Sequence, residues 1–509
     1  MKVKNRSVCQ TCRTRRLGCD GKRPECTQCV HSGRACDGYQ TSWTFVDSST
    51  SKSTLKQRKT GQVQHFQTSS SLGQDDAQET IQKGLSSSLS LGRAQASFHR
   101  PSRDDFITLV VRNYVPQDTV TAVHNDFRTK QPRICGAWVE VLPNLRNGGG
   151  TPDLVLAAAV EALATSILTQ KLNPNQDNVE SFQSYEVALR SLRKSFVVNQ
   201  RCDIELLASI MCLSLVELMM PSTSAALETH MKGAGQFFQA YGAEACSVGV
   251  LHTLFAGFRP LLIFEAFQFR KPTFLSSPAW MDAPFSIFSA SPMQSLLNKA
   301  AIIPTLLSQS DILLDKARQS NLEVKDLFNS LVDALVDLEN WEMEYSHEAD
   351  KWCYWPSDIP APLESISYGK PLWYTNVTMA NVYTNLWAFR IICFSELERL
   401  AENFPSFHMA HENIPLPRPL NLKRVHAYKT ALAKQICLSM DYLLRDEMGL
   451  FGPASTYFPL QAAYETFLEN EGTMRKEGIA FVEGVVLRLV QKGLRSAPVL
   501  VFTRRTMRV

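Results

Sequence analysis

Several familiar signals are missing from these 509 residues. No run of about 20 uncharged apolar residues occurs, and the basic start at residues 1–6 has no apolar core, so we expect neither a membrane span nor a secretory leader. Motifs of zinc proteases, serine hydrolases and phosphate-binding loops are also absent. We therefore expect a chain that is not an enzyme.

The net charge is also small, but the charged residues are unevenly distributed along the chain. The formal net charge is +4, and residues 1–40 hold nine Lys or Arg against three Asp or Glu. The remaining residues carry a net charge of −2. A polyanionic partner would therefore be met by the N-terminal segment alone.

Cysteines are concentrated in this same basic segment. Six of the 13 cysteines form two copies of C-x2-C-x6-C within 28 residues: Cys9, Cys12, Cys19, Cys26, Cys29 and Cys36. A C-x2-C pair suits tetrahedral zinc, and six thiolates can complete two four-ligand sites if two of them bridge both metals. The symmetry of the repeat favours Cys9 and Cys26 as the bridges. Because so short a segment buries little apolar surface, two Zn²⁺ ions, at about 10 kcal/mol or more each, would supply its folding energy.

Three other uses of these cysteines fit less well. Three disulfides would need an oxidising compartment. A redox pair would need one C-x-x-C beside a strand–helix unit. A RING-type site needs eight ligands, and His31 supplies at most a seventh.

The segment resembles the fungal Zn(2)-C6 zinc binuclear cluster of transcription factors. All six cysteines fall in register, residues 13–16 resemble the basic helix of that family, and Pro24 lies two residues before the fourth cysteine. The resemblance covers about 30 residues and implies bridging by Cys9 and Cys26. It also implies a nuclear regulator of RNA polymerase II genes that reads CGG-type triplets in the major groove of double-stranded DNA.

Five basic residues are the candidate DNA contacts: Arg13, Arg15, Arg16, Lys22 and Arg23. A short helix starting at Cys12 would project the arginines outward, where a guanidinium grips guanine O6 and N7 with two hydrogen bonds. By the resemblance, Arg16 is the principal base reader and Arg15 its neighbour, whereas the other three contact phosphates. Gly18 stands where the family often has Lys or Arg, which implies weaker binding or a shifted base preference.

Residues 41–100 change in character, since 20 of these 60 residues are Ser or Thr. We expect a disordered linker between a DNA-binding domain at 1–40 and a large domain at 101–509. No heptads follow the cysteines, so a monomer and a homodimer formed through the large domain both remain open. Short basic runs, including residues 56–59, are weak candidates for nuclear import.

The large domain is expected to be all-helical, which makes the whole chain mostly α. Helices are predicted at 177–198, 224–241, 376–402, 421–446 and 473–492, with others beginning at Thr151 and after Asp203. An apolar stripe with a 3.6-residue period is the clearest: Val324, Leu327, Phe328, Leu331, Val332, Leu335 and Leu338. Core packing explains this stripe better than a coiled-coil seam, because it spans only two heptads.

This region also resembles the fungal-specific transcription-factor regulatory domain, through residues 230–234, 452–454 and 458–460. The resemblance implies control of output by co-regulators or a small-molecule effector. From the chemistry alone, Gly233 and Gly235 are expected to allow close helix packing. His230 is expected to be a satisfied core or surface histidine rather than a ligand.

The remaining features favour structural roles. The other seven cysteines are expected to be mostly buried thiols, residues 354–356 and 373–374 to pack in the core, and His408 and His411 to lie in a loop. Residues 498–505 break the helical pattern and fit a strand, a frayed tail or an artefact of gene prediction. A helical sensor or scaffold with weak DNA contact stays open as the alternative function.

Overall fold

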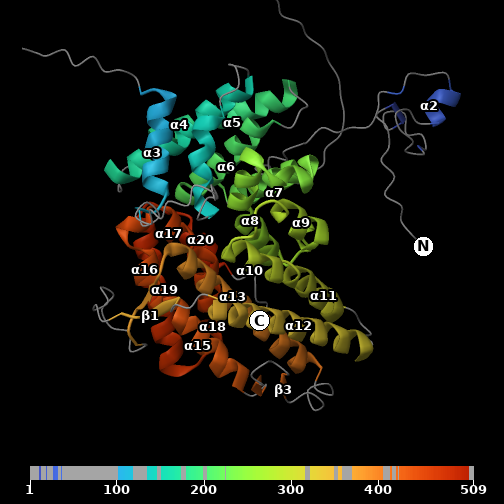
Figure 1. Ribbon diagram of the computed structural model, residues 1–509, viewed down its shortest axis with the longest axis vertical. Helices are drawn as coiled ribbons and strands as arrows, with labels where there is room; N and C mark the ends of the chain where they lie inside the picture. The colour runs from blue at the N-terminus through green and yellow to red at the C-terminus, as the bar shows by residue number, and fades with distance from the viewer. Residues whose placement is uncertain are drawn as a thin grey trace, which may run out of the picture. The chain divides into compact units, whose positions relative to one another are not determined.

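The computed structural model describes residues 11–12, 19, 27–32, 36, 101–117, 135–145, 151–172, 179–198, 203–223, 225–315, 321–348, 353–357, 369–404, 413–414, 420–421 and 424–503. The chain divides into two compact units, Met1–Arg100 and Pro101–Val509. Helices dominate the described residues of both, which confirms the mostly α fold class (Figure 1).

Helices build the second unit from its first described residues to its last. They are α3 (Arg103–Tyr114), α4 (Thr151–Leu172), α5 (Val179–Val198), α6 (Ile204–Met219), α7 (Ala226–Tyr241), α8 (Gly249–Phe269), α9 (Pro278–Asp282), α10 (Pro292–Ala300), α11 (Ile303–Asp315), α12 (Asn321–Glu348), α13 (Val377–Asn403), α15 (Val425–Leu438), α16 (Met440–Leu443), α17 (Phe451–Ala454), α18 (Tyr457–Glu469), α19 (Gly472–Gln491) and α20 (Ala497–Phe502). A 3₁₀ segment, Cys135–Asn144, packs against α3 and α8.

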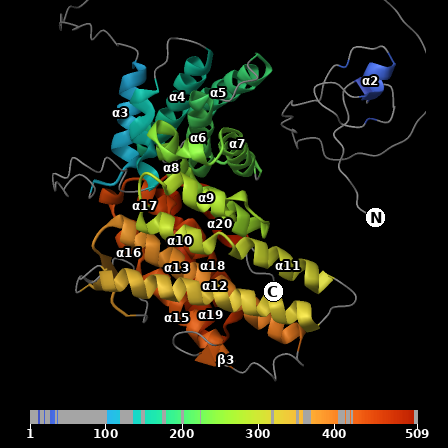
Figure 2. The same ribbon diagram turned by 45° about the vertical axis from the view of Figure 1, so that its right-hand side comes forward.

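The helices of this unit gather in two neighbouring groups around one core. Helices α3 to α7 form one end, with α4 packed on both α5 and α6 (Figure 1). Helices α10 to α13, α15, α18 and α19 form the other end, and the turned view shows α12 lying along α13 (Figure 2). Helix α8 contacts members of both groups, which joins them through its buried apolar side chains.

The observed helices agree with those predicted from 151 to 492 except near Ser439. The predicted helix 421–446 is instead divided into α15 and α16. The Ser439 hydroxyl donates to the Gln435 carbonyl at 2.7 Å, and the Ser439 N–H bonds to Ile436, only three residues back. This tighter turn interrupts the α-helical hydrogen-bond ladder. The spacing of apolar residues does not reveal such a break.

The apolar stripe of α12 faces the core. All seven of its residues, from Val324 to Leu338, are buried. Core packing is therefore confirmed as its role. Two other helices, over Asp153–Gln170 and Gly249–Phe269, are long and apolar enough to cross a membrane, but 56% and 67% of these windows are buried within the protein. Such burial is typical of core helices.

Two short antiparallel ribbons complete the described secondary structure. Strand β1 (Tyr354–Pro356) pairs with β2 (Leu372–Tyr374), and β3 (Asn413–Ile414) pairs with β4 (Leu420–Asn421). The ring of Tyr354 lies 4.9 Å from that of Tyr383 and 5.6 Å from that of Trp387, between centroids. Tyr374 is buried and Tyr354 and Trp373 are half-buried against the core, whereas Trp355 is 39% exposed and Pro356 is exposed too. Core packing is therefore confirmed for Tyr374, in part for Tyr354 and Trp373, and is wrong for residues 355–356.

The last described residues form a helix, not a strand or a frayed tail. Helix α20 buries Ala497 and Val501. Just before it, the Ser496 hydroxyl donates to the carbonyl of Leu218 at 2.7 Å, across 278 residues of sequence. This contact supplies a donor to the C-terminal end of α6, whose last carbonyls lack partners within the helix. The sequence pattern missed the helix because it is short and begins with Ala-Pro.

Four thiols of this unit lie in its core. Cys212, Cys246, Cys393 and Cys437 are buried. Burial raises the pKa of Cys212 and of Cys246 to about 12. The expectation of mostly buried thiols is confirmed for these four, whereas Cys135 and Cys353 are half-buried and Cys202 lies outside the described residues.

His230 takes part in a buried network that joins three helices. Its Nε2 lies 3.0 Å from the hydroxyl of Tyr185, which in turn donates to the carboxylate of Glu217. Ser222 adds two hydrogen bonds to Glu217, at 2.8 Å from its N–H and 2.5 Å from its hydroxyl. Since the tyrosine proton is committed to Glu217, neutral His230 carries its proton on Nε2 and donates it to Tyr185. His230 is a satisfied core histidine.

Close helix packing depends on glycines other than the two expected. An added Cβ would meet its nearest neighbour at 3.9 Å at Gly233 and at 3.4 Å at Gly235, which are ordinary contact distances. At Gly478 in α19 the same Cβ would lie 2.3 Å from Phe467 in α18. The prediction for the first pair is therefore wrong, since a methyl group fits at both sites.

We expect Gly478→Ala to lower the free energy of unfolding by about 1–3 kcal/mol, because the phenyl ring of Phe467 must move. Gly233→Ala is the matched control. It should be neutral or raise stability by up to about 1 kcal/mol, because alanine favours the helix and meets no close neighbour. Urea titration of both proteins measures this, and equal effects of the two substitutions would contradict the packing argument.

The buried histidine also predicts a pH dependence. Burial lowers the pKa of His230 to about 4, below its ordinary value of 6.5. Between these two pH values the unfolded chain binds a proton that the folded chain does not, so stability falls as pH falls. We expect the wild type to lose up to about 3 kcal/mol more than His230→Gln between pH 7 and pH 4. Parallel stability–pH curves for the two proteins would contradict this; buried Glu217 is present in both and cancels from the difference.

Candidate metal centre

Four of the six clustered cysteines belong to the described residues, and they lie together. Cys12 and Cys29 are 1% and 2% exposed, and Cys19 and Cys36 pack against them half-buried. Each half of the repeat contributes two of these thiols. Thiols from both copies of the repeat therefore pack together at the centre of this segment. Apolar side chains occupy the corresponding position in a larger protein.

The same local structure presents the second cysteine of each half. Thr11 and Cys12 are helical, and Cys29 lies in α2 (Thr27–His31). The Ser32 hydroxyl donates to the carbonyls of Gln28 at 2.7 Å and Cys29 at 3.0 Å, which closes the end of this short helix. His31, the last residue of α2, is exposed, which argues against its use as a seventh ligand.

The sulfur spacing fits zinc. The Sγ atoms of Cys12 and Cys29 are 3.8 Å apart. With Zn–S bonds of about 2.3 Å, two thiolates on one tetrahedral zinc are separated by about 3.8 Å. Within the described residues no group of three metal-ligating side chains lies close enough to hold an ion. A complete zinc site therefore needs ligands from outside that part, where Cys9 and Cys26 lie.

This distance also bears on which cysteines share a metal. If Cys9 and Cys26 bridge, Cys12 binds one zinc and Cys29 the other. The 3.8 Å separation instead equals the edge of a single tetrahedron. Either Cys9 and Cys26 bridge the two zinc ions, or Cys12 and Cys29 do. Substitution of a bridging cysteine removes a ligand from both zinc sites, so substitutions at the two pairs distinguish these arrangements.

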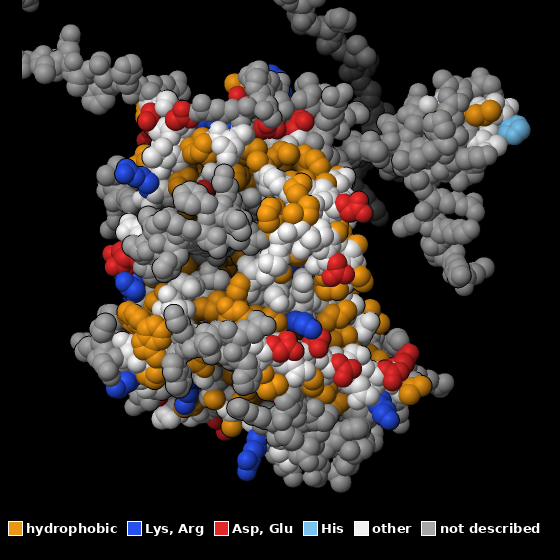
Figure 3. Space-filling view, viewed as in Figure 1, with side chains coloured by type: hydrophobic (Ala, Val, Ile, Leu, Met, Phe, Trp, Pro, Cys, Tyr) orange, Lys and Arg blue, Asp and Glu red, His pale blue; other side chains and the backbone are white. Residues whose placement is uncertain are grey.

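All five candidate DNA contacts lie outside the described residues: Arg13, Arg15, Arg16, Lys22 and Arg23. Gly18 lies outside them too. The helical residues Thr11 and Cys12 come directly before Arg13 in sequence. The helical unit does not substitute for them on the face shown in Figure 3, where the coloured Lys and Arg side chains are isolated and interspersed with acidic ones.

No second metal centre emerges among the described residues of the helical unit. His408 and His411 lie outside those residues, so their predicted loop stays a prediction. Sequence reasoning did miss a cavity in this unit, which Asn381 and Asn385 of α13 help to line. The available signal was two asparagines four residues apart within a stretch free of charged residues.

Comparisons with known proteins concern the N-terminal segment. Residues 7–43 match the family described as fungal Zn(2)-Cys(6) binuclear cluster domain. Over 36 residues the chain is 53% identical to an aspercryptin biosynthesis cluster-specific transcription regulator of Emericella nidulans. This match covers 7% of the present chain and 6% of that protein, and no solved structure matches. Residues 7–43 of this chain thus form a fungal Zn(2)-Cys(6) binuclear cluster domain, a domain that binds two zinc ions.

Proposed function

We propose that this chain is a nuclear, sequence-specific DNA-binding regulator of RNA polymerase II transcription. The observation that carries the proposal is the gathering of cysteines from both halves of the repeat within a segment that matches the zinc cluster domain. The similarity of this segment to one from a transcription regulator supports the same function. The helical unit would control the output of the DNA-bound protein through co-regulators or a small-molecule effector.

The DNA-reading step follows from the basic residues beside the cluster. Arg16 and Arg15 would read a CGG-type triplet in the major groove, and Arg13, Lys22 and Arg23 would bind phosphates. All six cysteines would hold the two zinc ions, with Cys9 and Cys26 shared between them. The metals would fix the backbone and supply no chemistry beyond that.

The ligand roles predict unequal effects of cysteine substitutions. Cys26→Ser removes a ligand from both zinc sites if Cys26 bridges, so the full-length protein should lose both ions and its DNA binding. Cys36→Ser removes a ligand from one site and should retain about one zinc per chain. Metal analysis after dialysis measures this. Equal zinc loss from both variants, with Cys12→Ser and Cys29→Ser now losing both ions, would instead assign the bridges to the closely spaced pair.

The DNA-reading roles predict two distinct losses. Selection from a randomised DNA library by the zinc-loaded full chain should enrich a CGG-like triplet. Arg16→Ala should cost about 1–3 kcal/mol on that triplet and flatten the preference. Lys22→Ala is the control: it should weaken binding to all sequences alike and reduce the log–log salt slope by about 0.9.

Failure of this experiment has a definite meaning. Binding that is weak and indifferent to sequence in a protein that holds two zinc ions would reject the DNA-reading proposal. The absence of a basic residue at Gly18 would then matter most, and the helical sensor or scaffold would become the better account. The spacing of enriched triplets also distinguishes a monomer, which selects one half-site, from a homodimer, which selects two at a fixed distance.

A further inference from the structure

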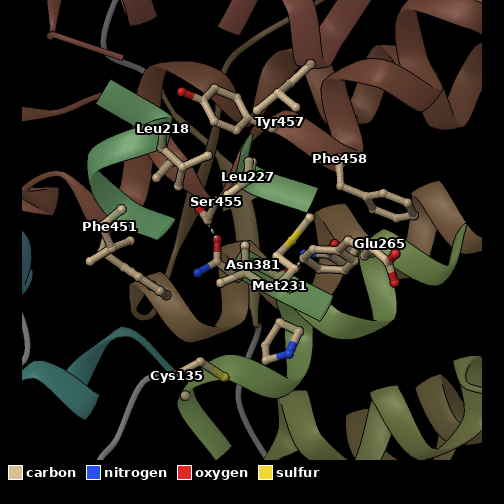
Figure 4. Close-up of a pocket in the computed structure, with 18 of the residues that line it drawn as sticks. Cys135, Leu218, Leu227, Met231, Glu265, Asn381, Phe451, Ser455, Tyr457 and Phe458 are labelled. Carbon is tan, nitrogen blue, oxygen red and sulfur yellow. Dashed lines mark hydrogen bonds between the residues drawn. The ribbon is translucent and has the colours of Figure 1, made fainter. Parts of the chain in front are cut away.

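A cavity of about 140 Å³ lies inside the helical unit. Most of its lining residues come from α6, α7, α8, α13, α17 and α18, elements far apart in sequence. In Figure 4 the side chains of Leu218, Leu227 and Met231 surround the same space as those of Phe451 and Phe458. An apolar cavity of about 150 Å³ is large enough to take up benzene, so this one has room for a single aromatic ring.

Several polar groups of the wall are already paired with one another or with neighbouring residues. Ser455 donates its hydroxyl to Asn381 Oδ1 at 2.6 Å, the contact drawn dashed in Figure 4. Gln461 donates to Glu465 at 3.1 Å and to the Thr503 carbonyl at 2.9 Å. Neither the Asn381 oxygen nor the Gln461 amide nitrogen is left without a partner for a ligand to supply.

Asn385 differs from these residues. It is 2% exposed, and its Nδ2 donates to the Asn381 carbonyl at 2.7 Å, one turn earlier in α13. Its Oδ1 is buried and has no hydrogen-bond partner. Since a buried amide oxygen without a donor is costly, such groups are rare in folded proteins. The unpaired oxygen belongs to a side chain that lines the cavity, where a bound molecule can supply the missing donor.

Electrostatics of the wall disfavour an anionic ligand. Glu265 is a lining residue, and burial raises the pKa of its carboxyl group even though Lys232 lowers it. A second negative charge placed nearby would meet both repulsion and desolvation. The Asn385 oxygen offers only an acceptor. A cationic donor would also lose its hydration among the mostly apolar lining side chains. A neutral donor therefore complements the site best.

We propose that this cavity binds a neutral, largely apolar molecule, about one ring in size, that donates a hydrogen bond to Asn385 Oδ1. Hydroxyl and amine groups on an aromatic or alicyclic ring have this chemistry. The site goes beyond the proposed DNA-binding function and does not rest on it, because every residue that carries the argument lies in the helical unit.

The test compares phenol with toluene, which have similar size and differ in the donor. Both are titrated into the zinc-loaded full chain by calorimetry or ligand-observed NMR. We expect saturable binding of both to the wild type. Asn385→Leu should lower the phenol-to-toluene affinity ratio about three- to tenfold, the range of one hydrogen bond, while toluene binding persists.

Two further measurements keep the outcome clear. Leu227→Trp places a large side chain in the cavity and should abolish binding of both probes, while its far-UV circular dichroism stays that of the wild type. If Asn385→Leu fails to fold, aniline and anisole on the wild type replace it, because aniline donates a hydrogen bond and anisole cannot.

Three results would overturn the proposal. The first is no binding of either probe to the wild type, and the second is an unchanged phenol-to-toluene affinity ratio in Asn385→Leu. The third is an affinity of the wild type for aniline that does not exceed its affinity for anisole. DNA binding by the same proteins is measured in parallel and should not change among these variants. A loss of probe binding therefore does not count against the DNA-reading proposal, nor does a loss of DNA binding count against the cavity.

Discussion

The burial of α13 is the constraint on which the helical unit depends. Most of this 27-residue helix is enclosed by protein, so its polar side chains must find partners inside. Arg390 donates to Glu342 at 2.7 Å, and Glu396 accepts from Arg270 at 2.8 Å. These ion pairs fix α12 and α8 against α13. The same requirement is left unmet at Asn385 Oδ1, which belongs to the wall of the cavity, and at Arg390 Nε.

The two units solve the folding problem by different means. The helical unit has an extended apolar core, in which Phe267 stacks on Phe389 with 5.1 Å between ring centroids. In the zinc cluster unit, the described residues that are buried are thiols, and an apolar core is not what gathers them. Its stability then follows metal supply and thiol chemistry, whereas that of the helical unit follows apolar burial. One chain thus contains two parts with separate sensitivities to their surroundings.

Much of this could be predicted from local sequence, because local sequence determines it. The stripe from Val324 to Leu338 predicted the helix and its buried face correctly. Apolar residues that recur every 3.6 positions lie on one face of a helix, and that face packs against the core. The spacing of the cysteines likewise indicated a metal site before any geometry was known.

What escaped prediction depends on partners distant in sequence. The break at Ser439, the helix at Ala497 and the demand for glycine at Gly478 rather than Gly233 all follow from tertiary contacts. The unpaired oxygen of Asn385 is invisible in sequence for the same reason.

The contact between Ser496 and Leu218 also affects synthesis of the chain, since 278 residues separate the two. At about 5–20 residues per second, the ribosome takes on the order of 10 s or more to deliver the donor that completes α6. During that interval the end of α6 and its apolar surroundings are incomplete, so the nascent chain exposes apolar surface that the finished protein covers.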